Sequence, residues 1–229
     1  MKIFLLIGLL LPAALLAQTA TLKPAARPRD PSLTPITDTP GLPRVLLIGD
    51  SISMGYTIPV RELLAGKANV HRIPENGGST RTGLEKLGAW LGAGKWDVIH
   101  FNWGLHDLKH MNGNKLDLAG EQVTIVPDYE ANLRLLVKQL GGTGSKLIWA
   151  TTTPVPEGSD GRAAGDEVKY NAAAARVMAE AKIPTDDLHA AAAARLAELQ
   201  RPKNVHFTEA GSRGLAEKVA ESIRAQLPK

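Results

Sequence analysis

The chain contains Val45-Leu46-Leu47-Ile48-Gly49-Asp50-Ser51, an apolar run that ends in a glycine, an aspartate and a serine. A short apolar run bounded by turn residues indicates a buried parallel strand, and the sites of open α/β sheets lie just beyond the carboxyl ends of such strands. We therefore expect Ser51 to open a helix at a strand end. The free N–H groups at a helix N-terminus favour negative charge, so Ser51 is a candidate nucleophile and oxyanion donor. Serine is also a leading N-cap residue, and this motif alone favours the structural role.

Strand and helix patterns alternate along the rest of the chain. Further strands are expected in the ranges 69–74, 96–103, 146–151 and 183–188. Helices are expected in the ranges 52–65, 80–91, 128–140, 167–181, 190–199 and 208–227. The alternation predicts an α/β fold, a three-layer α/β/α sandwich with a central, mostly parallel sheet of about five strands. Residues 108–126 form a long insertion at the end of the sheet where sites are built, so we expect a lid or substrate wall there, with a small hairpin around Gly120.

The first 20 residues predict a secretory signal peptide. Met1-Lys2 supplies a short positive region, an apolar core runs from Ile3 to Leu16, and small residues come next. A secreted or periplasmic protein is therefore expected. Residues 21–43 are rich in proline and poor in large apolar side chains, which is typical of an extended linker. The folded domain is then expected to span residues 44–229, a length that suits one domain with a sizeable core.

The composition argues against several classes of partner. The chain has no cysteine, so it forms no disulfide and carries no lipid on a cysteine after the signal. The formal net charge is +4, but Lys and Arg are scattered among acidic residues and form no basic block with interleaved aromatic residues. We therefore expect no nucleic-acid partner. Beyond the signal, no apolar segment approaches the roughly 20 residues that a membrane span needs, so no membrane partner is expected either.

Three further motifs follow in chain order: Gly77-Gly78, Gly104-Leu105-His106-Asp107 and Val205-His206-Phe207-Thr208. Together with Gly49-Asp50-Ser51 they resemble the SGNH (GDSL) hydrolase family over about residues 44–227. The resemblance implies a flavodoxin-like sheet and hydrolysis of esters by a serine nucleophile, without a cofactor. On the matching positions it implies Ser51 as the nucleophile, His206 as the general base and Asp50 as a residue that shapes the turn. Serine needs such a base within hydrogen-bond reach at neutral pH.

The histidine motif departs from the family at one position. The family usually has an aspartate three residues before the histidine, where it orients the imidazole, and here that position is Lys203. A lysine cannot accept the imidazole N–H, so the third member of a triad is missing from its expected place. A backbone carbonyl, a carboxylate from elsewhere or no group at all can stand in. The nearest candidate carboxylates in the sequence are Asp186, Asp187 and Glu209. We therefore predict a Ser51–His206 dyad.

The oxyanion hole departs from the family as well. The family places an asparagine where this chain has His106, and a neutral imidazole still donates one N–H. Asn102 is the alternative side-chain donor. Gly78 is the expected backbone donor, with Gly77 as its alternate, and the N–H of Ser51 completes the hole. The supporting residues of the site are expected to be Asp50, Asn76 and Asp107.

These residues favour an exported serine esterase of the carboxylic ester hydrolase class, acting on a small acyl ester such as an acetyl group on a carbohydrate. The partner is then a small-molecule or polysaccharide ester. One alternative is a carbohydrate-binding relative that has lost hydrolysis. Another is a metal-dependent hydrolase that uses His106 and His110, which lie four residues apart. Asn112-Gly113 breaks any helix that would align these two imidazoles, so no metal is expected.

Overall fold

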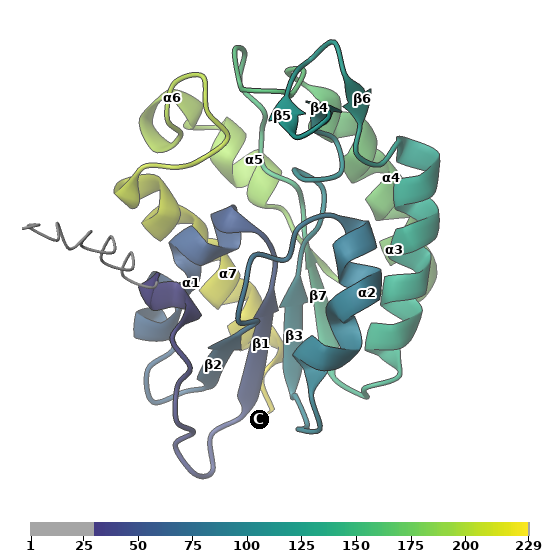
Figure 1. Ribbon diagram of the computed structural model, residues 1–229. Helices are drawn as coiled ribbons and strands as arrows, with labels where there is room; N and C mark the ends of the chain where they lie inside the picture. The colour runs from purple at the N-terminus through teal and green to yellow at the C-terminus, as the bar shows by residue number, and fades with distance from the viewer. Residues whose placement is uncertain (1–29, 229) are drawn as a thin grey trace, which may run out of the picture.

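The computed structural model describes residues 30–228, so the expected signal peptide and residues 21–29 of the expected linker lie outside the described residues. A five-stranded parallel sheet forms the centre, with the order β2-β1-β3-β7-β8 (Figure 1). Its strands are β1 (Arg44–Ile48), β2 (Asn69–Arg72), β3 (Val98–Phe101), β7 (Lys146–Ala150) and β8 (Thr185–Asp186). The predicted α/β/α sandwich with a flavodoxin-like sheet is confirmed, because this order is the 2-1-3-4-5 order of that class.

Helices cover both faces of the sheet. On one face α1 packs against α7, and on the other α2, α3 and α4 pack side by side (Figure 1). The helices are α1 (Ser51–Leu63), α2 (Thr80–Leu91), α3 (Val126–Gly141), α4 (Asp166–Ala181), α5 (Leu188–Ala193), α6 (Leu196–Leu199) and α7 (Glu209–Gln226). The expected helix over 190–199 is thus two short helices, α5 and α6. Within residues 30–228, no helix combines the length and hydropathy needed to cross a bilayer.

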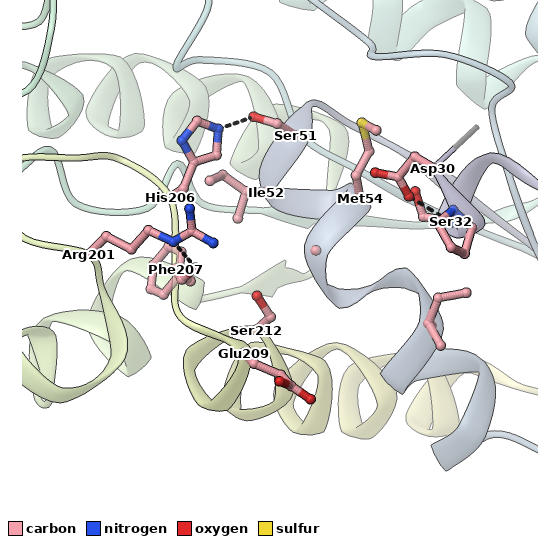
Figure 2. A pocket seen from close by; sticks show the side chains of 13 residues that line it. Asp30, Ser32, Ser51, Ile52, Met54, Arg201, His206, Phe207, Glu209 and Ser212 are labelled. Atoms are coloured by element: carbon pink, nitrogen blue, oxygen red, sulfur yellow. Dashed lines mark hydrogen bonds between the residues drawn. The ribbon is translucent and has the colours of Figure 1, made fainter. Parts of the chain in front are cut away.

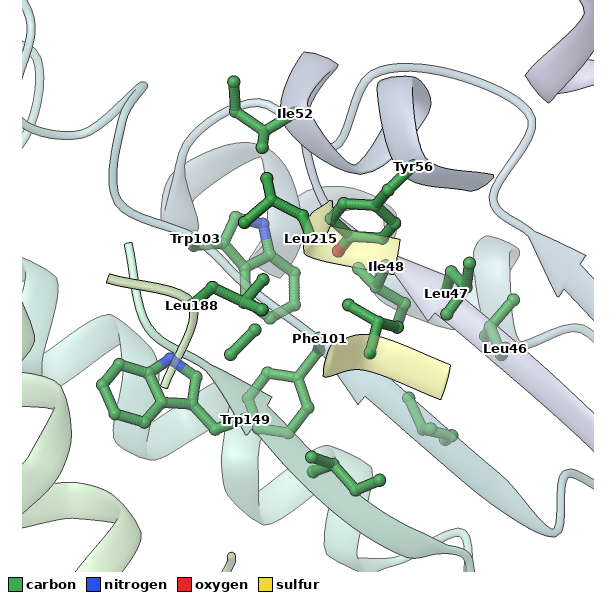
Figure 3. Packing of buried hydrophobic residues seen from close by; sticks show 14 of the residues in the cluster. Leu46, Leu47, Ile48, Ile52, Tyr56, Phe101, Trp103, Trp149, Leu188 and Leu215 are labelled. Atoms are coloured by element: carbon green, nitrogen blue, oxygen red, sulfur yellow. The ribbon is translucent and has the colours of Figure 1, made fainter. Parts of the chain in front are cut away.

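The core lies between the sheet and the two helix layers. In β1 the residues Val45 to Ile48 are all buried, as expected for a parallel strand covered on both faces. Ile48 pairs in register with Phe101 of β3, and Phe101 pairs with Trp149 of β7. These side chains pack with Leu188 and other buried residues (Figure 3). Full burial of each large apolar side chain stabilises the fold by about 1.5–3 kcal/mol, and this fixes the strand ends from which the loops leave.

The insertion forms a second, smaller sheet with the order β5-β4-β6, close to the carboxyl ends of the central strands (Figure 1). Its strands are β4 (His110–Asn112), β5 (Lys115–Leu116) and β6 (Glu121–Gln122). The expectation of a hairpin around Gly120 is wrong, because the tight turn between β4 and β5 lies at Gly113, which has φ of 57°. Gly120 is needed for a different reason, since a Cβ there would overlap the carbonyl of Met111.

The segment before β1 is not an extended linker in its described part. Pro31–Leu33 forms a 3-10 helix, η1, which packs against α1 and buries Ser32. The side chain of Asn69 accepts a hydrogen bond from Thr39 N (2.8 Å) and donates to the carbonyls of Thr39 and Leu42. Asn69 therefore satisfies backbone groups that an isolated proline-rich segment would leave to water, and the folded unit begins well before residue 44.

A buried carboxylate connects two loops at the top of the sheet. Asp107 is fully buried and accepts hydrogen bonds from the backbone N–H and the hydroxyl of Thr80, the first residue of α2. The N-cap residue Ser79 makes no side-chain capping bond, so Asp107 caps α2 from another loop. The loop after β3 and the loop after β2 are thereby held in one arrangement.

We predict that Asp107→Ala lowers the free energy of unfolding by about 1–3 kcal/mol, because it leaves two buried donors of Thr80 unpaired. Asp107→Asn keeps one acceptor oxygen and is the matched control. Burial raises the pKa of Asp107 to about 6 from 3.8. A carboxyl with a raised pKa contributes stability that is complete below pH 3.8 and is lost as the pH rises through about 6. Urea unfolding from pH 4 to 8 tests both points: a wild type and an Ala variant of equal stability would contradict the capping role.

Candidate active site

Ser51 and His206 are in direct contact. Ser51 is the first residue of α1, directly beyond β1, and Asp50 is the N-cap whose Oδ1 accepts the N–H of Ile52 at 2.9 Å. His206 lies in the loop between α6 and α7. The Oγ of Ser51 and the Nε2 of His206 are 2.8 Å apart (Figure 2). Two residues that are 155 positions apart in the chain therefore form a hydrogen-bonded pair.

The loop that carries His206 is held on both sides. Gln200 forms an antiparallel bridge with Phe207, and Arg201 N donates to the carbonyl of His206 at 2.9 Å. The side chain of Gln200 donates to the carbonyls of Pro154 and Val205, and Arg201 Nε donates to the carbonyl of Phe207 (Figure 2). These bonds fix the backbone at His206, so the direction of its ring does not depend on Ser51 alone.

Asn204 orients the imidazole. Its Oδ1 lies 2.7 Å from Nδ1 of His206 and accepts the backbone N–H of the same residue at 2.9 Å. An amide oxygen only accepts, so the proton sits on Nδ1 and Nε2 is free to accept the hydroxyl of Ser51. Lys203, at the position of the family's aspartate, is exposed with φ of 54°. Sequence reasoning missed Asn204, although an asparagine two residues before a histidine is the signal that would have found it.

The three carboxylates considered from the sequence do not contact His206. Asp186 is buried and hydrogen-bonded to His100 of β3, with Oδ2 2.9 Å from Nε2. Asp187 caps α5 by accepting the N–H of Ala190, and Glu209 begins α7. None of these three candidate carboxylates is therefore the group that orients His206.

Burial lowers the pKa of His206, and the positive charges of Arg201 and Arg162 lower it further, while Asp50 opposes them. The ring is therefore neutral at neutral pH, which is the state that accepts a proton. An amide partner in place of a carboxylate contributes no negative charge to counter these effects.

The predicted oxyanion donors differ in whether their N–H groups are free or already hydrogen-bonded. Within residues 30–228, none of the described hydrogen bonds uses the N–H of Ser51. The ring of His106 lines the same cleft as Ser51 and His206, and burial lowers its pKa, so the ring is neutral and donates one N–H. The N–H of Gly78, in contrast, donates to Oδ1 of Asn76 at 2.9 Å, and the N–H of Gly77 donates to the carbonyl of Gly49. Both glycine N–H groups, including the expected one, are thus already hydrogen-bonded, that of Gly78 within the loop and that of Gly77 to the end of β1.

Asn102 is not an oxyanion donor. Its Nδ2 donates to the carbonyl of Ala150 at 2.8 Å and lies 3.4 Å from the hydroxyl of Thr152. The side chain therefore connects the end of β3 to the end of β7. Gly104 lies against the same threonine, and a Cβ there would overlap its hydroxyl, which explains the glycine of this motif.

Arg72 is a site residue that sequence reasoning missed. Its guanidinium donates to the carbonyls of Gly49 (2.8 Å) and Asp50 (3.0 Å), to the hydroxyl of Ser53, and to the carbonyl of Glu75. Burial lowers its pKa to about 10, so the group stays charged at neutral pH. Arg72 thus braces the turn before Ser51 against the loop after β2. An arginine within the predicted strand 69–74 gave no signal of this role.

Two clefts meet at Ser51 and His206. One has a volume of about 470 Å³ and lies between α1, the start of α7 and η1, with Asp30, Arg201 and Glu209 among its lining (Figure 2). The other has a volume of about 410 Å³ and is bounded by the β4–β5 hairpin. Its lining includes Asn76, His106, Lys109, Met111, Asn114, Leu116 and Arg162. The insertion therefore forms a wall of the second cleft, in the region where the sequence predicted one.

The structure does not place His106 and His110 in the arrangement that the metal-dependent alternative requires. His106 lies in a turn and His110 begins β4, so the two imidazoles do not share a helix face. The Nδ1 of His110 is 2.9 Å from the carbonyl of Gly120. Among residues 30–228 no group of three or more His, Asp or Glu side chains is arranged to hold a metal ion.

We predict that Asn204→Asp raises the pKa of His206 by about 1–2 units, because a carboxylate at Nδ1 stabilises the charged imidazolium. Asn204→Ala removes the acceptor without adding charge and is the control, in which the pKa does not rise. Titration of the His206 ring signals by NMR measures both variants. A pKa in the Asp variant at or below that of the wild type would show that residue 204 is not the Nδ1 partner.

A scan against protein-family models and a search of curated protein sequences found no match. Solved structures, in contrast, match over most of the chain. A lipase/acylhydrolase from Enterococcus faecalis has 21% identity and a TM-score of 0.69, covering 82% of this chain and 98% of that one. Axe2, an acetylxylan esterase from Geobacillus stearothermophilus, has 22% identity and a TM-score of 0.64, with 79% and 94% covered.

A third similar structure is a protein from Slackia heliotrinireducens assigned to the SGNH hydrolases, with 21% identity, a TM-score of 0.60, and 80% and 99% of the two chains covered. These likenesses extend over nearly the whole of each of the three similar chains. With the sheet order and the order of the four motifs along the chain, they show that this protein has the fold of the SGNH hydrolases.

Proposed function

We propose that this protein is an exported serine esterase that hydrolyses a small acyl ester, such as an acetyl group on a carbohydrate. The observation that carries the proposal is the 2.8 Å contact between Ser51 Oγ and His206 Nε2. A hydroxyl next to a neutral, oriented imidazole is the arrangement that activates a serine nucleophile. The fold shared with esterases, and with acetylxylan esterases among them, supports the reaction class.

The first half of the reaction forms an acyl-enzyme. Nε2 of His206 takes the proton of Ser51 as Oγ attacks the carbonyl carbon of the ester. The oxyanion of the tetrahedral intermediate is stabilised by the N–H of Ser51 and the ring N–H of His106. Collapse of the intermediate breaks the ester bond, and His206 gives its proton to the departing alcohol. The acyl group is then bound to Ser51.

The second half returns the enzyme to its starting state. A water molecule gives a proton to Nε2 of His206 and attacks the acyl carbon, and the same oxyanion donors stabilise the new intermediate. His206 returns the proton to Oγ of Ser51 as the carboxylic acid leaves. Asn204 holds the ring through both halves of the reaction, because its Oδ1 accepts a hydrogen bond from the Nδ1–H of His206. Because an amide carries no charge, it orients the imidazolium but stabilises it less than a carboxylate, so the proposed esterase is slower than one with a full triad.

Ser51→Ala tests the proposal directly. The variant lacks the nucleophile, so we expect wild-type protein to hydrolyse p-nitrophenyl acetate and the variant to lose at least about 10³-fold in kcat. Ser222→Ala is the control, because Ser222 lies on α7 and lines neither of the two clefts that meet at Ser51. Release of p-nitrophenol and labelling by a serine-directed phosphonate are the measurements. Absence of turnover and of labelling in the wild type would leave the carbohydrate-binding alternative.

His106→Ala tests the oxyanion hole. Loss of one donor to the oxyanion lowers kcat by about 10²-fold with little change in KM, because the bond strengthens only in the transition state. His106→Asn restores the residue type of the family and is expected to retain most of the activity. Steady-state kinetics on a neutral acetyl ester distinguish the variants. Equal kcat in the wild type and the Ala variant would remove His106 from the mechanism.

A further inference from the structure

Two cationic side chains line the cleft that is bounded by the β4–β5 hairpin. Lys109 and Arg162 share this cleft with Ser51, His106 and His206. The two cations are close enough for the charge of Arg162 to lower the pKa of Lys109, and both lower the pKa of His106. Positive charge therefore gathers on one side of the proposed nucleophile.

Arg162 is held in position by backbone carbonyls. Its Nε donates to the carbonyl of Leu105 at 2.9 Å, and Nη1 lies 3.2 Å from the carbonyl of Asp160. The carbonyl of the preceding Gly161 accepts the N–H of His110, which ties this loop to β4. Among the described residues, none of the hydrogen bonds or ion pairs uses Nη2 of Arg162. The guanidinium is thus fixed at one edge while another edge remains free.

The carboxylates near the cleft form no ion pair with these cations. Asp107, whose charge favours the charged form of Lys109, binds Thr80, and the Oδ1 of Asp50 caps α1. The charges of Asp50 and Asp160 favour the charged form of Arg162 in the same way, so they offset part of the positive charge without pairing with it. Within residues 30–228 neither Lys109 nor Arg162 forms an ion pair, whereas the structure gives many pairs to other basic residues. Partial burial lowers the pKa of both side chains, which reflects the cost of removing unpaired cations from water.

The other cleft has a different charge. Asp30 and Glu209 accompany Arg201 there, and the Nε of Arg201 is bonded to the carbonyl of Phe207. Two carboxylates and one guanidinium line that cleft, whereas Asp50 is the one carboxylate that lines the hairpin-bounded cleft with Lys109 and Arg162. The cleft between α1, α7 and η1 therefore offers no comparable site for an anion. The contrast points to the hairpin-bounded cleft as the side of the Ser51–His206 pair that would hold a negatively charged portion of the substrate.

We propose that Lys109 and Arg162 bind an anionic group of the substrate, a carboxylate or a phosphate carried by the ester whose acyl group is transferred to Ser51. The inference rests on the proposed function and narrows its substrate class from acyl esters in general to negatively charged ones. The free edge of Arg162 donates to the oxygens of the anion, and the mobile ammonium of Lys109 supplies the second charge.

Matched pairs of esters test the proposal. O-acetylated methyl glucoside is compared with the O-acetylated methyl glycoside of glucuronic acid, which has a free carboxylate, and with O-acetylated glucose 6-phosphate. The neutral, carboxylate and phosphate forms are then separate arms. We expect kcat/KM to be about tenfold higher for one or both anionic esters, mainly through KM, and this preference to shrink as salt is added. Equal kcat/KM for all three esters in low salt would overturn the inference while leaving the esterase proposal intact.

Charge-removing variants assign the effect to the two residues. Lys109→Gln is expected to reduce the anionic-to-neutral ratio of kcat/KM to near one, and Arg162→Gln to do the same. Arg162→Lys keeps the charge and checks that a loss in Arg162→Gln is not a folding defect. Lys138→Gln removes an exposed positive charge on α3 and leaves the ratio unchanged. A ratio that falls equally in Lys138→Gln would show a general effect of net charge and overturn the assignment.

A binding measurement separates the two proposals. NMR titration of Ser51→Ala with the methyl glycoside of glucuronic acid, glucose 6-phosphate and methyl glucoside needs no turnover. Anion-dependent shifts that disappear in the Ser51→Ala, Lys109→Gln double variant support the anion site even if no ester is hydrolysed by the wild type. Equal, Lys109-independent responses to all three ligands would overturn the site even if the wild type is an active esterase.

Discussion

The rest of the site depends on the two hydrogen bonds that the carbonyl oxygen of Gly49 accepts. It accepts the N–H of Gly77 at 2.9 Å and the guanidinium of Arg72 at 2.8 Å, so the end of β1 and the loop after β2 meet at one oxygen. The approach is so close that a Cβ at Gly77 would lie 2.8 Å from this oxygen. These contacts hold the turn between β1 and Ser51 in one conformation. The turn then sets the orientation of the helix that begins at Ser51.

The pair formed by Ser51 and His206 depends on a second constraint from the opposite side. The loop after α6 is closed by Gln200 and Arg201, and Asn204 fixes the ring within it. One side of the pair is therefore positioned by the sheet and the other by a short loop that packs before α7. An amide adds no negative charge next to His206, so the imidazole stays neutral. In the proposed reaction, the charge that develops in the transition state is then stabilised mainly by the oxyanion donors and by groups of the substrate.

The two clefts arise from segments that are peripheral to the sheet. η1 closes one cleft, and the β4–β5 hairpin with the loop of Arg162 closes the other. In the proposed esterase, the sheet and its four motifs position the reacting groups, and these additions contact the substrate on each side. The proposed substrate preference is then a property of Lys109, Arg162 and the hairpin, and the proposed reaction type is a property of the strand ends.

The sequence alone determined the layers of the fold and the start of a helix at Ser51, because buried strands, amphipathic helices and strand-end motifs are local patterns. Its resemblance to the SGNH hydrolases pointed to His206. The sequence did not reveal Asn204, Arg72 or the placement of Asn102, and it suggested a glycine N–H that proved to be occupied by Asn76. Asn204 and Asn76 bond groups only two residues away, whereas Asn102 and Arg72 bond the distant carbonyls of Ala150 and Gly49. Only the tertiary structure decides whether such a polar group is free or already bonded, since hydrogen bonds across loops carry no periodicity in the sequence.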